Sequence, residues 1–181
     1  LYAVNRNLPA LAVSDFTSTQ VTWSTSLPTT HRAYEVADIV VRLVKGLVEN
    51  QAVAGGLLMP VGVGLNVNVP DFAAGAGAAQ QFKFTKVGKA TAYGPAFFEK
   101  LSDSPLAVAA GVNYALPGIS LATGGTTLPG GSTIPADTNP TSEQNVLNAK
   151  GFVTLSPIEG MPQARRSLED ALRLKLNALA Q

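Results

Sequence analysis

The 181-residue sequence contains no cysteine and one histidine, and both shortages exclude particular kinds of chemistry. Without cysteine the chain has no disulfide bond, no thiolate metal ligand and no cysteine nucleophile. A single histidine, His31, with no paired serine and aspartate motif gives no basis for a Ser-His-Asp triad. Its position at the start of a predicted helix favours a surface or capping role, with a catalytic base as the alternative.

Charge is scarce as well. Charged residues make up 14% of the chain against 46% hydrophobic residues, and the net charge is +1. No basic run is longer than Arg165-Arg166, so the sequence predicts no nucleic-acid polymer as a partner. No apolar run approaches the roughly 18 residues of a membrane-spanning helix, so no membrane partner is predicted. The apolar balance suggests a large buried fraction or a sizeable interface.

The first half of the chain alternates predicted strands and helices. The run LPALAVS, Leu8 to Ser14, is typical of a fully buried parallel strand. Thr29 and Thr30 offer helix caps, and apolar residues at three- and four-residue spacings then predict an amphipathic helix of about five turns. The expected apolar positions of this helix are Ala33, Val36, Ala37, Val40, Val41, Val44, Leu47 and Val48. A Gly/Pro turn and a strand at LNVNVP, Leu65 to Pro70, follow, and this order indicates an α/β fold.

The chain opens with LYAVNRN, which reads as the end of a helix that stops at Asn7. A helix tail followed at once by a buried strand implies preceding chain. We therefore expect this sequence to be the C-terminal part of a longer polypeptide.

The second half is richer in loops. The alternation from Phe82 to Ala90 predicts a strand, and the segment from Leu101 to Pro140 reads as loop with one short strand at GVNYALPG. A short helix that ends at Gly151 and a strand at FVTLSPI follow, and Pro162 opens a terminal helix. The predicted organisation is an α/β core at 1–92, a loop-rich extension at 93–140, and a strand with a C-terminal helix at 141–181. The Gly/Thr/Pro-rich extension, the low charge and the absence of cysteine lean towards an exported protein.

The terminal helix carries a stripe of four leucines on one face, at Leu168, Leu172, Leu176 and Leu179. Such a stripe is typical of core packing. The alternative is an arm that docks on a second subunit, because a terminal helix after a loop-rich region is easily exchanged between copies.

Four pieces in this order, LPALAVS, AYEVADIVVRLVKGL, LNVNVP and GFVTLSPI, resemble the C-terminal half of the SurE family of metal-dependent 5'-nucleotidases and acid phosphatases. LNVNVP is the most specific of them, and the loop from Gly94 to Pro140 matches poorly. The resemblance implies an α/β fold, namely part of a Rossmann-like doubly wound sheet with a C-terminal hairpin or loop extension and a terminal helix. It also implies hydrolysis of phosphomonoesters, with small phosphate esters or nucleotides as substrates.

The metal-binding motifs of that family are not found in this sequence. The resemblance implies an Asp-Asp pair near the N-terminus, a Ser and an Asn as metal ligands, and a Ser-Gly-Thr turn that binds phosphate. The only adjacent acids here are Glu169-Asp170 on the terminal helix. A divalent metal, Mg or Mn, is therefore expected in the complete enzyme but not bound by this chain alone, and we identify no catalytic residue and no metal ligand in the chain.

The expected partners are therefore the missing N-terminal half of the same protein and further copies of the chain. Members of the family associate as dimers through exchanged C-terminal elements, so a homo-oligomer through Pro162–Gln181 is expected. Three explanations of the absent half remain open. A proteolytic nick could have left the N-terminal half as a separate chain, the sequence could hold only this half, or the protein could be a truncated, inactive homologue. A non-catalytic structural or assembly protein is the competing function.

The candidate substrate-pocket residues are Ser14, Asp15, Asn66 and Asn68. Ser14 and Asp15 end a strand, and ligands of open α/β sheets bind beyond the carboxyl ends of strands, although a structural turn or cap is the alternative. Asn66 and Asn68 share one face of a strand, with Leu65, Val67 and Val69 on the apolar side. Buried amides need hydrogen-bond partners, so these two are expected to tie the sheet to neighbouring loop backbone, with contact to phosphate or nucleoside as the alternative.

Two further segments are of interest. DFTSTQVTWSTS is rich in hydroxyls and contains Trp23, which could stack on a base, although an ordinary surface loop is the alternative reading. TSEQN stands where the family has Thr-Asp, and Ser142 replaces the acid, so the role of that Asp is in doubt here.

Overall fold

The structure is a computed structural model that describes residues 2–17, 26–88, 90, 93–128, 131–149, 151–160 and 164–179. The chain divides into two units. Unit 1 consists of Leu1–Val87 and Thr141–Gln181, and unit 2 consists of Gly88–Pro140. Each unit is described by itself below.

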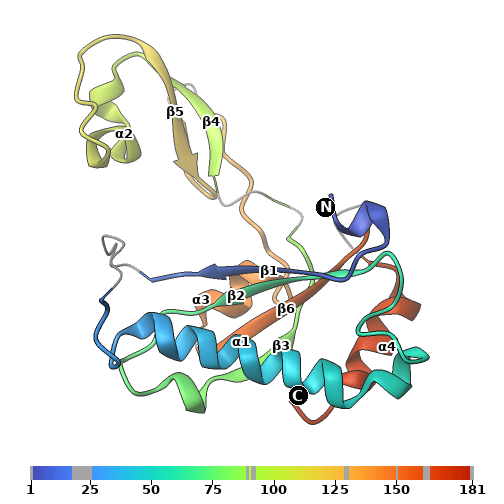
Figure 1. Ribbon diagram of the computed structural model, residues 1–181. Coiled ribbons are helices and arrows are strands. Elements are labelled where there is room, and N and C mark those ends of the chain that lie inside the picture. The colour runs from blue at the N-terminus through green and yellow to red at the C-terminus, as the bar shows by residue number, and fades with distance from the viewer. Residues whose placement is uncertain are drawn as a thin grey trace. The chain divides into compact units, whose positions relative to one another are not determined.

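Unit 1 is built on a four-stranded mixed sheet with helices on both faces (Figure 1). The strands are β1 (Ala10–Asp15), β2 (Gly64–Val69), β6 (Phe152–Ile158) and β3 (Gln81–Phe84), in that spatial order. β1 and β2 are parallel, β6 is antiparallel to β2, and β3 is parallel to β6. The expected Rossmann-like α/β fold is confirmed, and the predicted strand FVTLSPI is β6.

The core of unit 1 lies between the sheet and α1 (Arg32–Glu49). The apolar side of β2 faces this core, and Leu65, Val67 and Val69 are all fully buried there. Their burial confirms that the apolar residues of LNVNVP point away from the two asparagines. At about 25 cal/mol per Å² of buried apolar surface, such side chains provide most of the driving force for folding.

The cap of α1 confirms one prediction and corrects another, and the buried face differs from the expected stripe. His31 caps the helix, because its Nδ1 accepts a hydrogen bond from the Ala33 N–H at 3.1 Å. The capping role favoured for His31 is confirmed, whereas the caps expected at Thr29 and Thr30 were wrong. The residues of α1 that face the core are Ile39, Leu43, Gly46 and Leu47. Of the expected apolar stripe, Val41 and Val48 are about half exposed. Charged residues recur along one side of this helix, from Glu35 to Glu49, but the apolar arc on the other side is wider than the buried face. The spacing alone therefore does not select which part of that arc packs.

β1 was predicted to be fully buried, and this was wrong. Its first two residues are partly buried and its last four are exposed, including Val13. The strand does run parallel to β2, as expected. β1 is an edge strand of the described sheet, and an edge strand has a neighbour on one side only.

The terminal helix α4 (Arg166–Lys175) packs its leucines on the core of its own chain. Leu172 and Leu176 are buried, and Leu168 and Leu179 pack against the same cluster. A Cβ at Gly46 of α1 would clash with the Leu179 side chain, so this glycine permits the close approach of the two segments. The stripe therefore serves core packing, the first of its two expected roles, and the expected opening residue, Pro162, lies outside the described residues.

Lys175, at the end of α4, is an unusual member of this packed region. Its side chain is 1% exposed, and its Nζ donates to the backbone oxygen of Leu57 at 2.6 Å. Burial disfavours the charged form and lowers the pKa of the Lys175 ammonium from its ordinary value of 10.5. Since the unfolded chain then binds this proton more tightly than the folded chain, stability rises with pH between the lowered pKa and 10.5.

Lys175→Met should therefore raise the free energy of unfolding at neutral pH, where the buried lysine of the folded chain has to carry its charge. Methionine keeps the aliphatic packing and removes the buried charge. Urea titrations at neutral and alkaline pH measure the change, which should shrink as the pH approaches 10.5. Lys45→Met, at an exposed position of α1, is the control and should have little effect. A less stable Lys175→Met would mean that the bond to Leu57 outweighs the cost of burial.

The other elements of unit 1 are short. LYAVNRN ends in the 3-10 helix η1 (Val4–Arg6), and Asn7 follows it in the left-handed region with φ 60°. The 3-10 helices η2 (Gln51–Ala54) and η3 (Gly77–Ala79) lie in the connections. β3 ends at Phe84, well before the predicted Ala90, although Lys86 still forms a bridge with Ser142. The predicted short helix is α3 (Glu143–Asn148), capped by the Ser142 side chain.

Unit 2 contains an antiparallel ribbon of β4 (Tyr93–Phe98) and β5 (Gly118–Thr123), together with η4 (Leu101–Asp103) and α2 (Pro105–Ala109). The expected hairpin in the extension is therefore present. The predicted strand at GVNYALPG was wrong, because β5 starts only at Gly118. In β4 alternate residues are buried, and Ala96 and Phe98 pack with Ala122 of β5.

Candidate functional site

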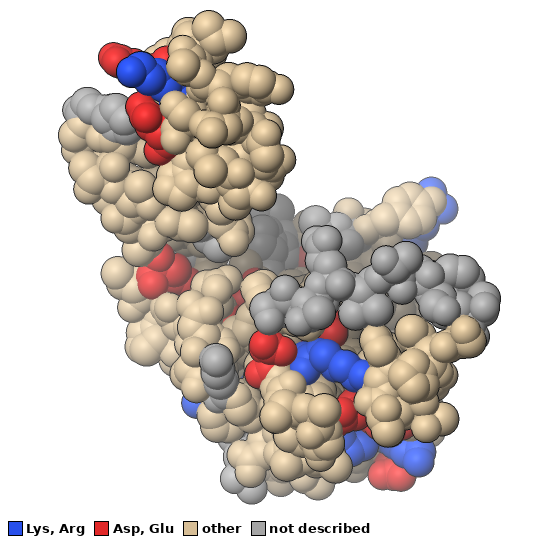
Figure 2. Space-filling view, turned by 90° about the vertical axis from the view of Figure 1, so that its left-hand side faces the viewer, with Lys and Arg blue, Asp and Glu red and all other residues tan. Residues whose placement is uncertain are grey.

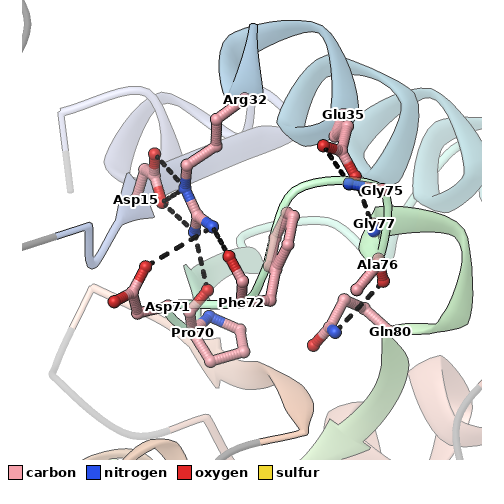
Figure 3. Close-up of polar contacts among 10 residues, drawn as sticks. All are labelled: Asp15, Arg32, Glu35, Pro70, Asp71, Phe72, Gly75, Ala76, Gly77 and Gln80. Atoms are coloured by element: carbon pink, nitrogen blue, oxygen red, sulfur yellow. Dashed lines mark hydrogen bonds and ion pairs between the residues drawn. The ribbon is translucent and has the colours of Figure 1, made fainter. Parts of the chain in front are cut away.

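The carboxyl ends of β1 and β2 lie at the same edge of the unit 1 sheet, next to the first turn of α1 (Figure 3). Asp15 is the last residue of β1, and residues 70–72 follow β2 directly. Arg32, the first residue of α1, lies between these two segments. Because ligands of open α/β sheets bind at such an edge, we take Asp15, Arg32 and Asp71 as the candidate site and call them the edge cluster.

Arg32 holds the two segments together. Its Nη2 donates to Asp15 Oδ1 at 2.6 Å and to the Pro70 backbone oxygen at 2.7 Å, and its Nη1 donates to the Phe72 backbone oxygen at 3.0 Å. Asp71 Oδ1 lies 3.6 Å from Nη1, and the guanidinium carbon lies 3.8 Å from the centre of the Phe72 ring. A guanidinium engaged on its face and along its edge has little freedom, so it fixes the direction of both carboxylates.

One turn along α1, Glu35 holds the next loop in place. Its carboxylate accepts hydrogen bonds from the N–H groups of Gly75, at 2.9 Å, and Gly77, at 2.7 Å (Figure 3). These two backbone donors lower the pKa of the Glu35 carboxyl. A Cβ at Gly77 would lie 2.7 Å from the Glu35 Cβ, so glycine is needed for the approach. The loop between β2 and β3, which contains Gly75 and Gly77, is thereby tied to the same helix end as the edge cluster.

A cavity of about 930 Å³ lies beside the edge cluster. Its polar lining consists of Asp15, Thr17, Thr30, His31, Arg32 and Asp71. Figure 2 looks at this end of unit 1 and shows basic side-chain atoms flanked by acidic ones on the surface. Two carboxylates and one guanidinium leave the edge cluster with a net negative charge, so the cavity favours hydrogen-bond donors and cations over anions.

The edge cluster does not fit a divalent metal centre. Asp15 and Asp71 both face the Arg32 guanidinium, which takes the place that a cation would occupy between them. Within the part of the chain that the structure describes, no group of three or more His, Cys, Asp or Glu side chains could hold a metal ion. Hard cations such as Mg²⁺ and Mn²⁺ require several converging oxygen ligands.

Ser14, Asn66 and Asn68 lie on the opposite face of the sheet from α1. In the register of the sheet Ser14 is paired with Asn68, and Asn68 with Thr154 of β6. Ser14 is exposed, whereas Asn68 is 7% exposed. Of the four residues expected in a pocket, only Asp15 therefore lines the cavity at the edge cluster, while the other three belong to a polar face of the sheet.

The side-chain amides of Asn66 and Asn68 donate hydrogen bonds to other side chains. The prediction that they bond to loop backbone was wrong. The Nδ2 atoms of Asn66 and Asn68 donate to Glu143 Oε2 at 2.8 and 3.4 Å, and Ser156 Oγ donates to the same oxygen at 2.8 Å. Asn68 Nδ2 also lies 3.3 Å from Thr154 Oγ1. Glu143 begins α3, so this network fixes α3 on the sheet.

Ser142 keeps a structural role at the position where the resemblance expects an acid. Its Oγ accepts a hydrogen bond from the Asn145 N–H at 3.3 Å and caps α3. Serine and aspartate are about equally good caps, so the replacement preserves the start of the helix.

Sequence reasoning missed Arg32, Asp71 and Glu143. Asp71 follows β2 in the same way that Asp15 ends β1, so the position of the two strand ends could have revealed it. Glu143 meets Asn66 across 77 residues, and no local pattern reports such a contact. Trp23, which was considered as a stacking residue, lies outside the described residues.

Among the described residues, no helix is both long enough and apolar enough to cross a membrane. No protein-family model and no curated protein matches the sequence.

The mixed sheet and its flanking helices have a Rossmann-like fold, and the chain as a whole has a fold of the SurE type. The chain is similar to the crystal structure of the SurE protein from Aquifex aeolicus, with a TM-score of 0.51 and 17% sequence identity. The similarity covers 94% of this chain and 53% of that chain, so our chain spans about half the length of that protein. At 17% sequence identity, this structural similarity shows a shared fold and nothing more.

Proposed function

We propose that this chain is the C-terminal part of a metal-dependent phosphomonoesterase of the SurE type, a 5'-nucleotidase or acid phosphatase. The single observation that supports this most is the SurE-like fold, which extends over 94% of the chain while covering 53% of the compared protein. The LNVNVP strand adds sequence-level support, because its asparagines and proline resemble the family pattern.

The edge cluster then contributes one wall of the substrate pocket. Asp15 and Asp71 accept hydrogen bonds from the alcohol part of a small phosphate ester or nucleotide, and Arg32 orients them. Their net negative charge disfavours phosphate at this wall. The phosphate and the divalent ion, Mg or Mn, are therefore assigned to the N-terminal half of the same protein, outside this chain.

The exposed flank of unit 1 supports an N-terminal half as partner. The last four residues of β1 are exposed at the sheet edge, and an open strand edge is ready to pair with a further strand. On the outer side of α1, Tyr34, Val41 and Val48 are each about half exposed. Continuation of the sheet by an upstream segment would cover both features.

The test is hydrolysis of p-nitrophenyl phosphate and nucleoside monophosphates by the natural protein, with Mg²⁺ or Mn²⁺ and with a chelator. Intact-mass analysis of the same sample should reveal the N-terminal segment, with its Asp-Asp pair, joined to this chain or travelling with it. The chelator should abolish hydrolysis. In this protein Asp71→Asn should raise KM several-fold, because an amide is a weaker acceptor than a carboxylate. Asp38→Asn, on α1 but away from the edge cluster, should leave KM unchanged.

Two results would reject the proposal. One is a natural protein of full length without phosphatase activity under any of these metals. The other is hydrolysis that the chelator does not affect.

A non-catalytic assembly protein is the second candidate, and one observation favours it. The outer face of the ribbon in unit 2 is apolar and exposed, with Tyr93, Phe97, Ile119 and Leu121 each at least half exposed. Exposed apolar patches of this kind mark interaction surfaces. A protein without phosphatase activity that associates through this face would support this alternative.

A further inference from the structure

Unit 2 contains a cavity of its own that the proposed hydrolysis does not use. Its volume is about 410 Å³, and it lies between the start of α2, the end of β5 and the turn at residues 123–128. Phe98 and Ala122, which are 4% and 5% exposed, form part of the lining, and Leu106 and Leu128 form part of its walls. Small-molecule sites in proteins are typically cavities of about 300–1,000 Å³ with mostly apolar walls.

The helical wall of this cavity is held in place by buried hydroxyl groups. Ser104 is fully buried, and its Oγ accepts a hydrogen bond from the Ala107 N–H at 3.2 Å, which caps α2. The same Oγ donates to Ser120 Oγ at 2.8 Å, which joins α2 to β5. A movement of α2 away from β5 would break this bond and cost the buried Ser104 hydroxyl its acceptor.

The turn on the other side is fixed as well. The Thr126 N–H donates to the Thr123 backbone oxygen at 3.0 Å, and the two side-chain hydroxyls lie 2.8 Å apart. The Ile134 N–H donates to the Thr126 backbone oxygen at 3.0 Å. Both walls are therefore formed before a ligand arrives, and a preformed site avoids the ordering cost of binding.

The charge of the lining selects the ligand. Asp103 is the one charged residue among those that line the cavity. Its side chain is exposed, and no Lys or Arg of the described residues forms an ion pair with it. A carboxylate at the rim of an apolar cavity attracts a cation and repels an anion. The complementary ligand has an apolar body and an ammonium group.

We propose that this cavity binds a small organic amine with an aromatic or aliphatic body. The body packs on Phe98, Ala122 and Leu106. The ammonium group lies at the rim, where Asp103 accepts its hydrogen bond and the Thr123 and Thr126 hydroxyls provide further polar contacts. This site is separate from the edge cluster and does not depend on phosphatase activity.

The experiment is a titration of the ¹⁵N-labelled chain with 2-phenylethylamine, followed by amide chemical shifts. We expect shifts confined to residues 98–128 and a dissociation constant of about 1 mM, the range for a ligand of this size. The neutral analogue 2-phenylethanol should bind more weakly, and the anion 3-phenylpropanoate should bind most weakly or not at all.

Asp103→Asn should weaken the binding of 2-phenylethylamine about threefold, the scale of one exposed ion pair. It should leave the affinity for 2-phenylethanol unchanged. Glu99→Gln is the matched control, since Glu99 is also exposed and acidic but does not line the cavity, and it should change neither affinity. The amide spectrum of each variant reports whether unit 2 has kept its fold. Absence of shifts in this region, or equal loss of affinity in both variants, would overturn the proposal.

Discussion

Leu172→Ala should lower the free energy of unfolding of unit 1 by about 2–5 kcal/mol, the range for a truncated leucine in a packed core. Leu172 is 0% exposed and belongs to the cluster that α1, the sheet and α4 form together. The truncation removes buried apolar surface and leaves a cavity that the surrounding elements can close only in part. Urea denaturation followed by far-UV circular dichroism measures the loss.

The same helix offers a matched control two residues further on. Leu174 is 69% exposed, so Leu174→Ala should change the free energy of unfolding by less than about 0.5 kcal/mol. The pair tests which face of α4 packs, because both changes remove the same atoms from the same helix. Equal losses in the two variants would mean that α4 packs differently from the arrangement described.

The second large effect is expected at Glu143. Glu143→Ala should cost about 2 kcal/mol, because the donors of Asn66 and Ser156 lose the acceptor that they share in a partly buried site. Urea denaturation measures the change in stability, and NMR reports on the contact itself. The chemical shifts of the Asn66 and Asn68 side-chain amides should change when their acceptor, Glu143, is replaced.

Gln144→Ala is the control for this prediction. Gln144 is the next residue of α3, and its side-chain Nε2 donates to Asn148 Oδ1 of the same helix at 3.0 Å. A small effect at Gln144 and a large one at Glu143 would assign the cost to the contact between α3 and the sheet. If Glu143→Ala is as stable as the unchanged protein, the network does not hold α3 in place.

The comparison of α1 with β2 explains where sequence reasoning succeeded. In β2 the two-residue period separates Asn66 and Asn68 from Leu65 and Val67 without ambiguity, and the structure keeps that separation. In α1 the apolar residues cover an arc wider than the face that packs, so several positions of that face satisfy the 3.6-residue period. The face that packs is the one that meets the sheet, and the sheet is assembled from strands far away in the chain.

The candidate site shows the same division. Asp15 could be proposed from its position at the end of a strand, because that position follows from local order along the chain. The pairing of Asp15 with Arg32 spans 17 residues, and the contact from Arg32 to the Phe72 backbone spans 40. Whether a carboxylate faces a pocket freely or faces a guanidinium decides its chemistry, and only the folded chain shows which is the case.

The sequence by itself determined the class of fold, the order of the main strands and helices, and the lack of thiol chemistry. These features depend on composition and on patterns that repeat every two or about four residues, so residues close together in the sequence determine them. Only the tertiary structure decided that β1 lies at an exposed edge of the sheet and that Arg32 neutralises part of the negative charge of the edge cluster. It alone also decided that the Glu143 carboxylate accepts hydrogen bonds from Asn66 and Asn68. Each of these depends on contacts between distant segments, whose geometry is set by packing and not by local preference.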